Sequence, residues 1–309
     1  SVMDRKEVAI IGLGPSGVSA AIYLKRYGMT PICYEKELIG GKVNKTEKIE
    51  NYAGIPSISG PDLGMKLEEQ LGKFSIKPIY KDVKEVKKNE DGTFTVSTSK
   101  DSKDFYYVIL ANGLGEKPFP IPGEDTFNKR GISRCAICDG SFYQGKDVAV
   151  IGGGNSAFEE ATYLSDICLH VTLIARRREF RAQESVVEEF RSRNNTEILA
   201  PYNIISASGE NSISSIVVKN NETGEEKTLS ISGLFLYVGE EATSSYVQIP
   251  EIKDEKGIII TDGKMETSVP HLYAIGDCRN TPLRQVVTAT NDGAIAATAI
   301  HDDYQKTQK

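Results

Sequence analysis

The sequence predicts an α/β protein built from two parallel-sheet domains, one inserted into the other, and two observations support this class. The first is an arrangement that occurs twice: a short apolar run, a glycine-rich turn, a helix-like stretch and a second strand. Each copy has about 30 residues, the usual size of a βαβ unit. The second is a pair of breaker-rich segments, at 112–118 and 239–242, which divide the chain into three parts. Two such units predict two Rossmann-like domains.

Composition and charge narrow the classes of function. Hydrophobic residues make up 39% of the 309-residue chain and charged residues 26%, as is usual for globular proteins. The net charge of −6 argues against nucleic acid as a partner. No apolar stretch approaches the roughly 18 residues of a membrane-spanning helix. The first residues, Ser1–Lys6, lack the apolar core of a signal peptide. We therefore expect a cytoplasmic protein with neither a nucleic acid nor a membrane as its partner.

The first repeat begins with a buried strand and ends with an acid. Val8–Ile11 is a continuous apolar run, typical of a parallel strand. A helix to about Tyr27 and a strand at Pro31–Tyr34 follow the glycine-rich turn. Glu35 comes next, 23 residues after Gly12. A carboxylate there accepts hydrogen bonds from a ribose diol and repels a 2′-phosphate, which favours FAD or NAD over NADP.

The turn of this repeat, at residues 12–17, has the sequence Gly-Leu-Gly-Pro-Ser-Gly. Gly12 permits the tight turn, Gly14 lets a pyrophosphate approach the backbone, and Gly17 lets the helix pack closely on the sheet. The phosphate charge would then lie at a helix N-terminus, which favours anions. The alternative is a glycine-rich turn without a ligand, which the flanking strand and helix and the spacing to Glu35 disfavour.

The second repeat differs from the first where its second strand ends. A strand at Val148–Ile151 leads into Gly-Gly-Gly-Asn-Ser-Ala at 152–157, where alanine is an accepted third residue. A helix to about Leu164 and a strand at His170–Ile174 complete the repeat. Arginines rather than an acid then follow, within a region that holds eight of the twelve arginines of the chain.

These arginines indicate which nucleotide the second repeat binds. Arg176, Arg177 and Arg181 stand where an acid would hold a ribose diol. Because guanidinium groups bind phosphate bidentately and remain charged, they predict a 2′-phosphate and hence NADPH. The alternative is a solvated basic start to a helix.

Between the first repeat and the first crossing, Lys77–Asp104 is predicted to form short strands with a turn at Asp91–Gly92.

A Cys-x-x-Cys pair, Cys135-Ala-Ile-Cys138, lies within the middle part of the chain and precedes Asp139. Such a pair can close a small disulfide at a helix N-terminus, where the dipole lowers the pKa of a thiolate. A thiolate reduces a partner disulfide through a mixed disulfide, and Asp139 could relay the proton.

A structural zinc site is the main alternative for the cysteine pair. Such a site needs about four ligands, and the sequence contains no second Cys-x-x-Cys. The remaining cysteines, Cys33, Cys168 and Cys278, are isolated, so we expect them to be buried small hydrophobes. No metal is therefore predicted.

In order along the chain, these motifs resemble the low-molecular-weight thioredoxin reductases. The match includes both glycine turns, the cysteine pair, the arginines and Thr-Ser-Val-Pro-His-Leu-Tyr-Ala-Ile-Gly-Asp at 267–277. The resemblance implies an FAD-binding domain in two segments, 1–113 and 242–309, and an inserted NADPH-binding domain at 114–241 that carries the cysteines. It also implies a homodimer.

The resemblance also places residues along each nucleotide. Asp277 would hold the ribityl chain, although it could be a plain helix N-cap, and Arg284 would lie beside the flavin ring, although it could be a surface charge. The full set implied for FAD is Gly12, Gly14, Pro15, Ser16, Gly17, Glu35, Lys36, Gly40, Gly41, Lys42, Asn51, Val83, Ala111, Gly276, Asp277, Arg284, Gln285 and Val286, and that for NADPH is Gly152, Gly154, Asn155, Ser156, Ala157, Arg176, Arg177 and Arg181.

The sequence departs in four places, at five residues, from the pattern common in the family. Residues 111–113 are Ala-Asn-Gly instead of Ala-Thr-Gly, and residues 239–243 are Gly-Glu-Glu-Ala-Thr instead of Gly-x-x-Pro-Asn. Ala175 replaces the usual histidine before the arginines, and Lys42 replaces the common glutamine. The first two departures bear on the crossings between domains, and Ala175 bears on the choice between NADPH and NADH.

The function implied by the resemblance is the reduction of thioredoxin by NADPH. The electrons would pass through FAD and the Cys135–Cys138 disulfide, with Cys138 facing the flavin and Cys135 attacking the partner. The domains would rotate about the crossings near residues 113 and 240. One enzymatic alternative is a reductase of the same architecture for a glutaredoxin-like or peroxide-reducing partner. Another is a variant that takes electrons from ferredoxin instead of NADPH, which the second nucleotide motif disfavours. A ferredoxin–NADP reductase would lack the cysteine pair, and a nucleotide-binding redox sensor would lack turnover.

Overall fold

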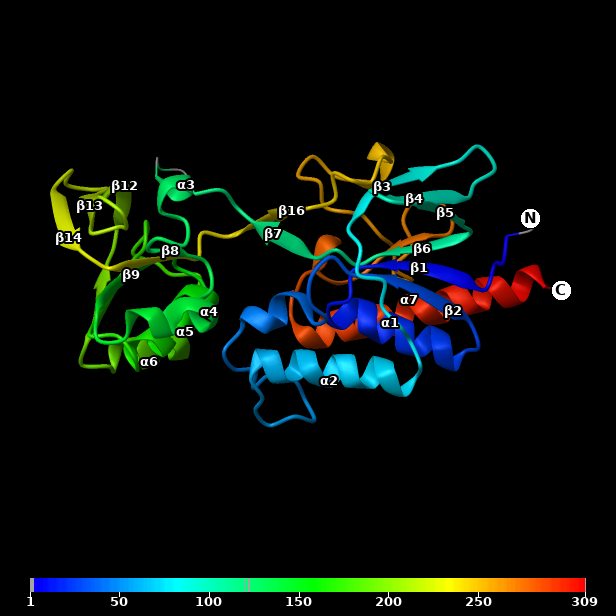
Figure 1. Cartoon of the computed structure of the whole chain (residues 1–309), viewed down its shortest axis with the longest axis horizontal. Helices are drawn as coiled ribbons and strands as arrows, with labels where there is room; N and C mark the ends of the chain where they lie inside the picture. The colour runs from blue at the N-terminus through cyan, green and yellow to red at the C-terminus, as the bar shows by residue number, and fades with distance from the viewer. Residues whose placement is uncertain (1–2, 120, 122, 309) are drawn as a thin grey trace. The chain divides into compact units, whose positions relative to one another are not determined.

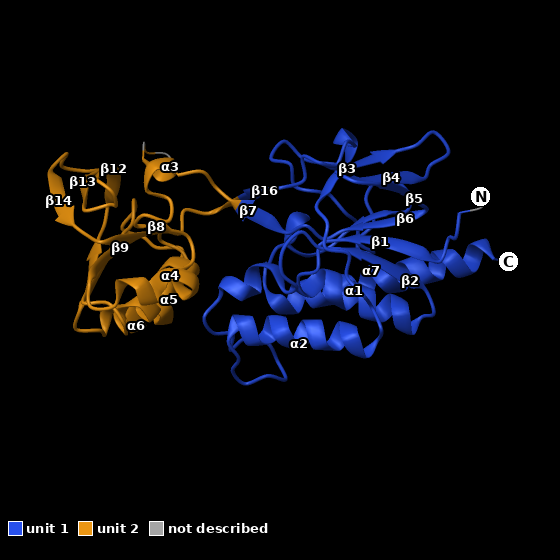
Figure 2. Cartoon of the chain, viewed as in Figure 1, with its two compact units in different colours: residues 1–115, 241–309 blue, residues 116–240 orange. Residues whose placement is uncertain are grey.

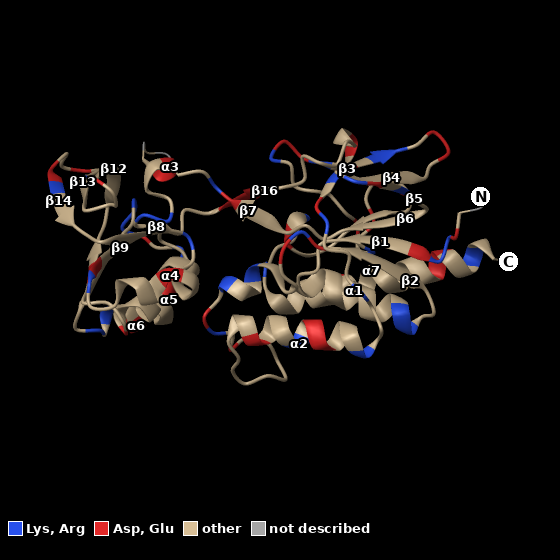
Figure 3. Ribbon diagram, in the orientation of Figure 1, with Lys and Arg blue, Asp and Glu red and all other residues tan. Residues whose placement is uncertain are grey.

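The chain forms two compact units (Figures 1 and 2) in a computed structural model that describes residues 3–119, 121 and 123–308. Unit 1 combines residues 1–115 with 241–309, and unit 2 is residues 116–240. The outermost residues of the expected first domain, Ser1, Val2 and Lys309, lie outside the described residues. Figure 3 shows that both signs of charge are spread over each unit.

The two crossings between the units are strands rather than loops. β7 (Leu114–Glu116) and β16 (Glu240–Ala242) pair with each other in a two-stranded sheet. The units therefore divide after Gly115 and after Glu240. These divisions lie two residues after the expected first boundary and one residue before the expected second, and both fall within the paired strands.

Unit 1 contains a parallel sheet in the order β17-β6-β1-β2. Its strands are β1 (Glu7–Ile11), β2 (Thr30–Tyr34), β6 (Tyr107–Leu110) and β17 (Leu272–Ala274). Every residue of β6 and β17 is buried. Continuous burial of this kind arises when both faces of a parallel sheet are covered.

Different layers cover the two faces of this sheet (Figure 1). The helices α1 (Pro15–Arg26), α2 (Gly60–Lys73) and α7 (Val286–Thr307) pack with Val8 and Ile10 of β1. The antiparallel strands β3 (Val83–Lys88), β4 (Phe94–Thr98) and β5 (Ser102–Phe105) pack on the alternate residues, Ala9 and Ile11. The expected strands within 77–104 and their turn are confirmed, since Thr93 N donates to Asp91 Oδ1 at 3.0 Å.

Unit 2 repeats this three-layer arrangement. Its parallel sheet has the order β11-β10-β9-β15-β8. The sheet strands are β8 (Ile132–Ser133), β9 (Asp147–Ile151), β10 (His170–Ile174), β11 (Thr196–Leu199) and β15 (Gly233–Leu236). The covering elements are the helices α5 (Asn155–Ser165) and α6 (Glu184–Arg191) and the antiparallel strands β12 (Tyr202–Ser208), β13 (Ser215–Asn220) and β14 (Glu226–Ser230). The α/β class with one Rossmann-like domain inserted into another is confirmed.

Short helices complete the two units. They are η1 (Gly41–Lys45), α3 (Glu124–Phe127), α4 (Ala136–Asp139), η2 (Gly140–Tyr143), η3 (Pro250–Ile252) and η4 (Gly276–Cys278). Among the helices formed by the described residues, none has the length and apolar composition that crossing a membrane would require.

Candidate active site

The first glycine turn connects β1 to α1 and has a backbone that requires glycine. Gly12 has φ +106°, and a Cβ there would overlap the carbonyl oxygen of Ala111. A Cβ at Gly17 would overlap the carbonyl oxygen of Gly12, so the helix could not pack as closely. At Gly14, in contrast, a Cβ would have one neighbour, Gly40 O at 3.7 Å. The backbone is therefore open at the position where a pyrophosphate would lie, next to the start of α1.

Glu35 lies beside this turn and is 7% exposed. Its Oε1 accepts from the N–H of Leu13 at 2.9 Å, and its Oε2 accepts from the N–H of Glu37 at 2.8 Å. A carboxylate has about four lone-pair positions, so both oxygens retain capacity for a ribose diol. The acid therefore fits its expected role and also fastens the glycine turn.

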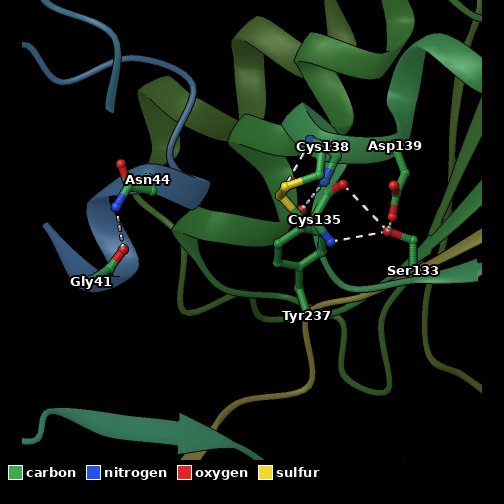
Figure 4. Close-up of a disulfide and its surroundings, with 8 residues drawn as sticks. Gly41, Asn44, Ser133, Cys135, Cys138, Asp139 and Tyr237 are labelled. Carbon is green, nitrogen blue, oxygen red and sulfur yellow. Dashed lines mark hydrogen bonds between the residues drawn. A yellow bond between two sulfur atoms is a disulfide. The ribbon is translucent and has the colours of Figure 1, made fainter. Parts of the chain in front are cut away.

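The segment at Gly40–Lys42 lies against the same turn. Gly40 N donates to Leu13 O at 2.8 Å, and Gly41 lies near Gly14, since a Cβ on Gly41 would be 3.5 Å from Gly14 Cα. Inside η1, Asn44 Nδ2 donates to Gly41 O at 3.1 Å (Figure 4). The two expected flavin segments, 12–17 and 40–42, are thus brought together.

Asp277 lies in η4, after the end of β17, and Arg284 holds the loop that follows. Arg284 Nε donates to Asp277 O and its Nη2 donates to Arg279 O, both at 3.0 Å. Burial raises the pKa of the Asp277 carboxyl above its usual range, while the positive charges of Lys42 and Arg284 lower it. Arg284 is thus half-buried and bonded to the backbone of this loop.

The N-cap interpretation of Asp277 is wrong. Helix α7 begins at Val286, and its N-cap is Gln285, whose side chain forms a capping box with Thr288. Asn51 Nδ2 donates to Gln285 Oε1 at 3.1 Å, so two expected flavin residues 234 positions apart meet. The contact lies at the start of the helix that carries Val286.

The remaining residues expected at FAD differ in exposure. Ala111 and Val83 are buried, and Val83 packs in the core beneath β1. Their backbones rather than their side chains are the groups available to a nucleotide. The side chain of Lys36 is exposed. The backbone N–H of Gly276 donates to Asp292 Oδ2 at 3.0 Å.

The second glycine turn connects β9 to α5 in unit 2. Gly152 has φ +149°, and a Cβ there would overlap Tyr237 O. Gly154 has open space around its Cα, since a Cβ would meet nothing within 4 Å. Asn155 Oδ1 accepts from Gln183 N at 2.8 Å, which fixes the start of α5. This turn therefore has the same open approach to a helix N-terminus as the first.

Arg176, Arg177, Arg178 and Arg181 lie on the loop that follows β10, which we call the arginine loop. A hollow of about 410 Å³ lies beside this loop. Its lining residues are Arg176, Arg177, Arg178, Glu179, Pro201, Asn221 and Glu222. Asn221 Nδ2 donates to Arg176 O at 3.0 Å, and Arg178 pairs with Glu222 through bonds of 3.1 and 2.8 Å. Arg176 and Arg177 line this hollow and Arg181 does not, and all three side chains are exposed.

The cysteine pair forms a disulfide at the start of α4 (Figure 4). Cys135 is the N-cap and is 7% exposed, whereas Cys138 is exposed. Cys138 N donates to Cys135 Sγ at 3.2 Å. An N–H aimed at a sulfur stabilises negative charge on it, so Cys135 is prepared to become a thiolate.

Residues 135–139, which carry the disulfide, are called the redox turn here. Two hydroxyl groups that the sequence did not predict bind to this turn. Ala136 N donates to Tyr237 Oη at 3.0 Å, and Cys135 N donates to Ser133 Oγ at 3.1 Å. Ser133 Oγ also donates to Asp139 Oδ2 at 2.6 Å. Ser133 could be suspected from sequence because it precedes the motif by two residues, whereas Tyr237 is 101 residues from Ala136 and carries no such signal.

The isolated cysteines are buried free thiols, as expected. Burial raises the pKa of Cys33 and of Cys278 to about 12, and that of Cys168 to about 11. These thiols are therefore protonated near neutral pH. Within the described ranges, no three His, Cys, Asp or Glu side chains are grouped as metal ligands.

Two glycine turns of the dinucleotide-binding type and a surface disulfide on one of the units define a disulfide oxidoreductase that uses two nucleotide cofactors. The sequence profile of the pyridine nucleotide-disulphide oxidoreductase family matches residues 6–293. The thioredoxin reductase of Bacillus subtilis is 36% identical over 98% of this chain and 96% of its own length, and that of Mycoplasma pneumoniae is 39% identical over 96% and 94%.

A solved structure gives the same result. The thioredoxin reductase of Lactococcus lactis in its FR conformation has a TM-score of 0.92 and 37% identity, and the match covers 96% of this chain and 98% of that one. The chain belongs to the low-molecular-weight thioredoxin reductase family. It is an FAD- and NADPH-dependent flavoprotein oxidoreductase.

Proposed function

We propose that this chain reduces the disulfide of thioredoxin with electrons from NADPH, passed through FAD and the Cys135–Cys138 disulfide. The observation that carries this proposal is the disulfide itself, formed at the start of α4 on the unit that also holds the arginine loop. When bound, NADPH would supply a hydride and FAD would pass its two electrons on to the disulfide. The residues of the chain bind, orient and handle protons.

Unit 1 would hold FAD. The open turn at Gly14 would receive the pyrophosphate and Glu35 the ribose diol, in keeping with the fit of both groups. Asp277, Lys42 and the Asn51–Gln285 pair would lie along the rest of the cofactor. The residues 1–113 and 242–309 would thus be one FAD-binding domain.

Unit 2 would hold NADPH between the turn at 152–157 and the arginine loop. Gly154 and the start of α5 would receive the pyrophosphate. Arg176 and Arg177 would bind the 2′-phosphate, because Arg178 is paired with Glu222. Arg181 would act from the edge of this site. Residues 114–241 would form the NADPH-binding domain.

The two cysteines would act in sequence. Cys138 is the exposed cysteine, so the two electrons that bound FAD would supply would enter there, which breaks the S–S bond and leaves a sulfur anion on each cysteine. The Cys135 thiolate, stabilised by the N–H of Cys138, would then attack the disulfide of the partner. Asp139 would supply a proton to the Cys138 sulfur of the opened disulfide. Attack on the mixed disulfide by Cys138 would re-form the original bond and release reduced thioredoxin.

An exposed aromatic side chain close in sequence to the disulfide supports a protein as the partner. Phe142 in η2, four residues after Cys138, is 71% exposed, the highest value among the large hydrophobic side chains of the described residues. A large exposed aromatic group beside a reactive site is typical of a contact with another protein. The homodimeric state and the cytoplasmic location belong to the same proposal. The three free thiols favour this location, because a reducing compartment keeps such thiols reduced.

The test uses the purified full chain with FAD bound. We expect NADPH to bleach the flavin without oxygen, and oxidised thioredoxin to restore the colour over many turnovers. Cys138→Ser should keep the flavin and its bleaching but lose reduction of thioredoxin. Normal turnover by this variant would refute the assigned route. A glutaredoxin-like protein, a peroxide-reducing protein and reduced ferredoxin serve as competing substrates, and a strong preference for one of them would replace thioredoxin or NADPH in the proposal.

A further inference from the structure

The hydroxyl of Ser133 lies between the backbone of the first cysteine and the carboxylate of Asp139 (Figure 4). Ser133 ends β8 and is 7% exposed. Its Oγ is 2.6 Å from Asp139 Oδ2, 3.1 Å from Cys135 N and 3.3 Å from Cys135 O. One buried hydroxyl therefore touches both the redox turn and the carboxylate to which we assign proton transfer.

A hydroxyl has one hydrogen and two lone pairs, which limits these contacts. The N–H of Cys135 can only donate, so it uses a lone pair of Ser133 Oγ. The hydrogen of Ser133 can then go either to Asp139 Oδ2 or to Cys135 O. A distance near 2.6 Å is typical of an O–H donating to a carboxylate. The ionised form of Asp139 therefore takes the hydrogen.

The alternative arrangement suits the protonated acid. When Asp139 carries a proton, its O–H can donate to Ser133 Oγ, and the Ser133 hydrogen can turn to Cys135 O, 3.3 Å away. The change requires rotation of hydroxyl hydrogens and no movement of heavy atoms. Ser133 thus has a suitable hydrogen-bond arrangement for both protonation states of Asp139.

We propose that Ser133 is a positioning residue for proton transfer, which keeps the Asp139 carboxyl tied to the backbone of Cys135 in both of its protonation states. The inference rests on the proposed function of Asp139. Reduction of the Cys135–Cys138 bond to a dithiol takes two electrons, which the NADPH-dependent activity supplies, and two protons. Asp139 would deliver one of these protons and recover it from solvent.

The other titratable groups around Asp139 are phenols and acids of the same unit. Burial, and then the charge of Asp139, raises the pKa of Tyr143 on η2. Burial is also the largest cause that raises the pKa of Tyr237, followed by the charge of Glu160, with smaller contributions from Glu116 and Asp139. Both phenols remain protonated near neutral pH. The proton that Ser133 responds to is therefore that of Asp139 rather than that of a tyrosine.

A double-mutant cycle tests the inference in the full chain with FAD bound, using Ser133→Ala, Asp139→Asn and the double variant. We expect Ser133→Ala to lower turnover with thioredoxin about tenfold, the effect of losing a hydrogen bond to a charged group. Asp139→Asn should lower it about a hundredfold. The double variant should match Asp139→Asn alone, because Ser133 acts through the carboxylate. Bleaching of the flavin by NADPH should be unchanged throughout.

Two further variants complete the design. Ser133→Thr keeps the hydroxyl and should retain most of the turnover. Ser165→Ala removes another buried hydroxyl of unit 2, which donates to Thr162 O, and should have no effect on turnover. If Ser133→Ala failed to bind FAD or to fold, Ser133→Gly would take its place in the cycle.

The outcomes separate the inference from the function on which it rests. Multiplicative losses in the double variant would assign Ser133 a structural role and overturn the inference, as would normal turnover of Ser133→Ala beside an impaired Asp139→Asn. Normal turnover of Asp139→Asn would instead remove Asp139 from the proposed mechanism, and the inference with it.

Discussion

The carboxylate of Glu35 has two tasks that a substitution would affect together. Its oxygens accept the N–H groups of Leu13 and Glu37, so they hold the glycine turn in place before any nucleotide arrives. The same carboxylate is the group expected to bind the ribose diol. A neutral or shorter replacement would therefore loosen the turn as well as remove an acceptor, and the loss of FAD affinity would combine both effects.

The three isolated thiols should be inert while the protein is folded. A thiolate reacts with iodoacetamide and a thiol does not, and burial raises the pKa of Cys33 and Cys278 to about 12 and that of Cys168 to about 11. At pH 8 the reduced native protein should take up label in the peptide that carries Cys135 and Cys138. Protein unfolded in urea should take up label at all five cysteines. Peptide mass spectrometry measures both, and label on Cys278 in the native protein would contradict its burial.

At the scale of elements, the loop after β10 should select between the two nicotinamide nucleotides. Arg176 and Arg177 line the hollow, and Arg178 is already paired with Glu222. Replacing Arg176 and Arg177 by alanine should raise KM for NADPH about tenfold or more and leave KM for NADH nearly unchanged, because a charge-assisted phosphate contact is lost. Steady-state kinetics with both nucleotides measures the ratio.

Arg178→Ala is the matched control for that experiment. This arginine belongs to the same loop, but its guanidinium is held by Glu222, so its removal should have a much smaller effect on KM for NADPH. An unchanged ratio of the two KM values in the double variant would remove Arg176 and Arg177 from the phosphate site.

The short helix η2 should contribute to binding of the protein partner. Phe142 is 71% exposed, and burying a side chain of this size contributes about 1.5–3 kcal/mol. Phe142→Ala should raise KM for thioredoxin about tenfold and leave the rate with a small aromatic disulfide unchanged. Ile205→Ala, on the exposed side of β12, is the control and should change neither value. Equal losses with both substrates would show that Phe142 affects the chemistry rather than docking.

The elements differ in how far the sequence could predict them. Both glycine turns, their strands and the redox turn were predictable because each has a recognisable pattern within one short stretch of the sequence. The contacts of Ala136 with Tyr237, of Asn51 with Gln285 and of Arg178 with Glu222 join residues 101, 234 and 44 positions apart. Such contacts depend on how segments pack, which local patterns do not specify. Both boundaries fall within the pairing of β7 with β16, which is a contact of the same kind.

At the scale of the molecule, the two units have the same three-layer architecture but differ in the residues that follow the second strand of each repeat. Each has a parallel sheet covered by helices on one face and by an antiparallel sheet on the other. An acid ends the second strand of the first repeat, and arginines end that of the second. The repeated architecture therefore gives two open glycine turns, and the residues after the second strand decide which nucleotide each unit accepts.

Besides the β7–β16 ladder, the side chain of Asn112 joins the two crossings of the chain inside unit 1. Asn112 Nδ2 donates to Thr243 Oγ1 at 3.2 Å and to Ser244 Oγ at 3.0 Å, and Tyr246 Oη donates to Asn112 Oδ1 at 2.7 Å. The family commonly has threonine at the first of these crossings and asparagine at the second. This chain has the two residue types exchanged, and its amide and hydroxyl face each other across the two crossings.

The exchange can be tested by reversing it. Asn112→Thr alone should lower the thermal midpoint of unit 1, because the Tyr246 hydroxyl loses its acceptor at a cost of about 1–3 kcal/mol. Thr243→Asn in the same chain returns an amide to the site and should recover part of this loss. Release of flavin fluorescence on heating measures the midpoint of the parent, both single variants and the double variant. Since coupled residues give non-additive effects, a double variant as unstable as the sum of the single losses would show that the two crossings are not coupled through this pair.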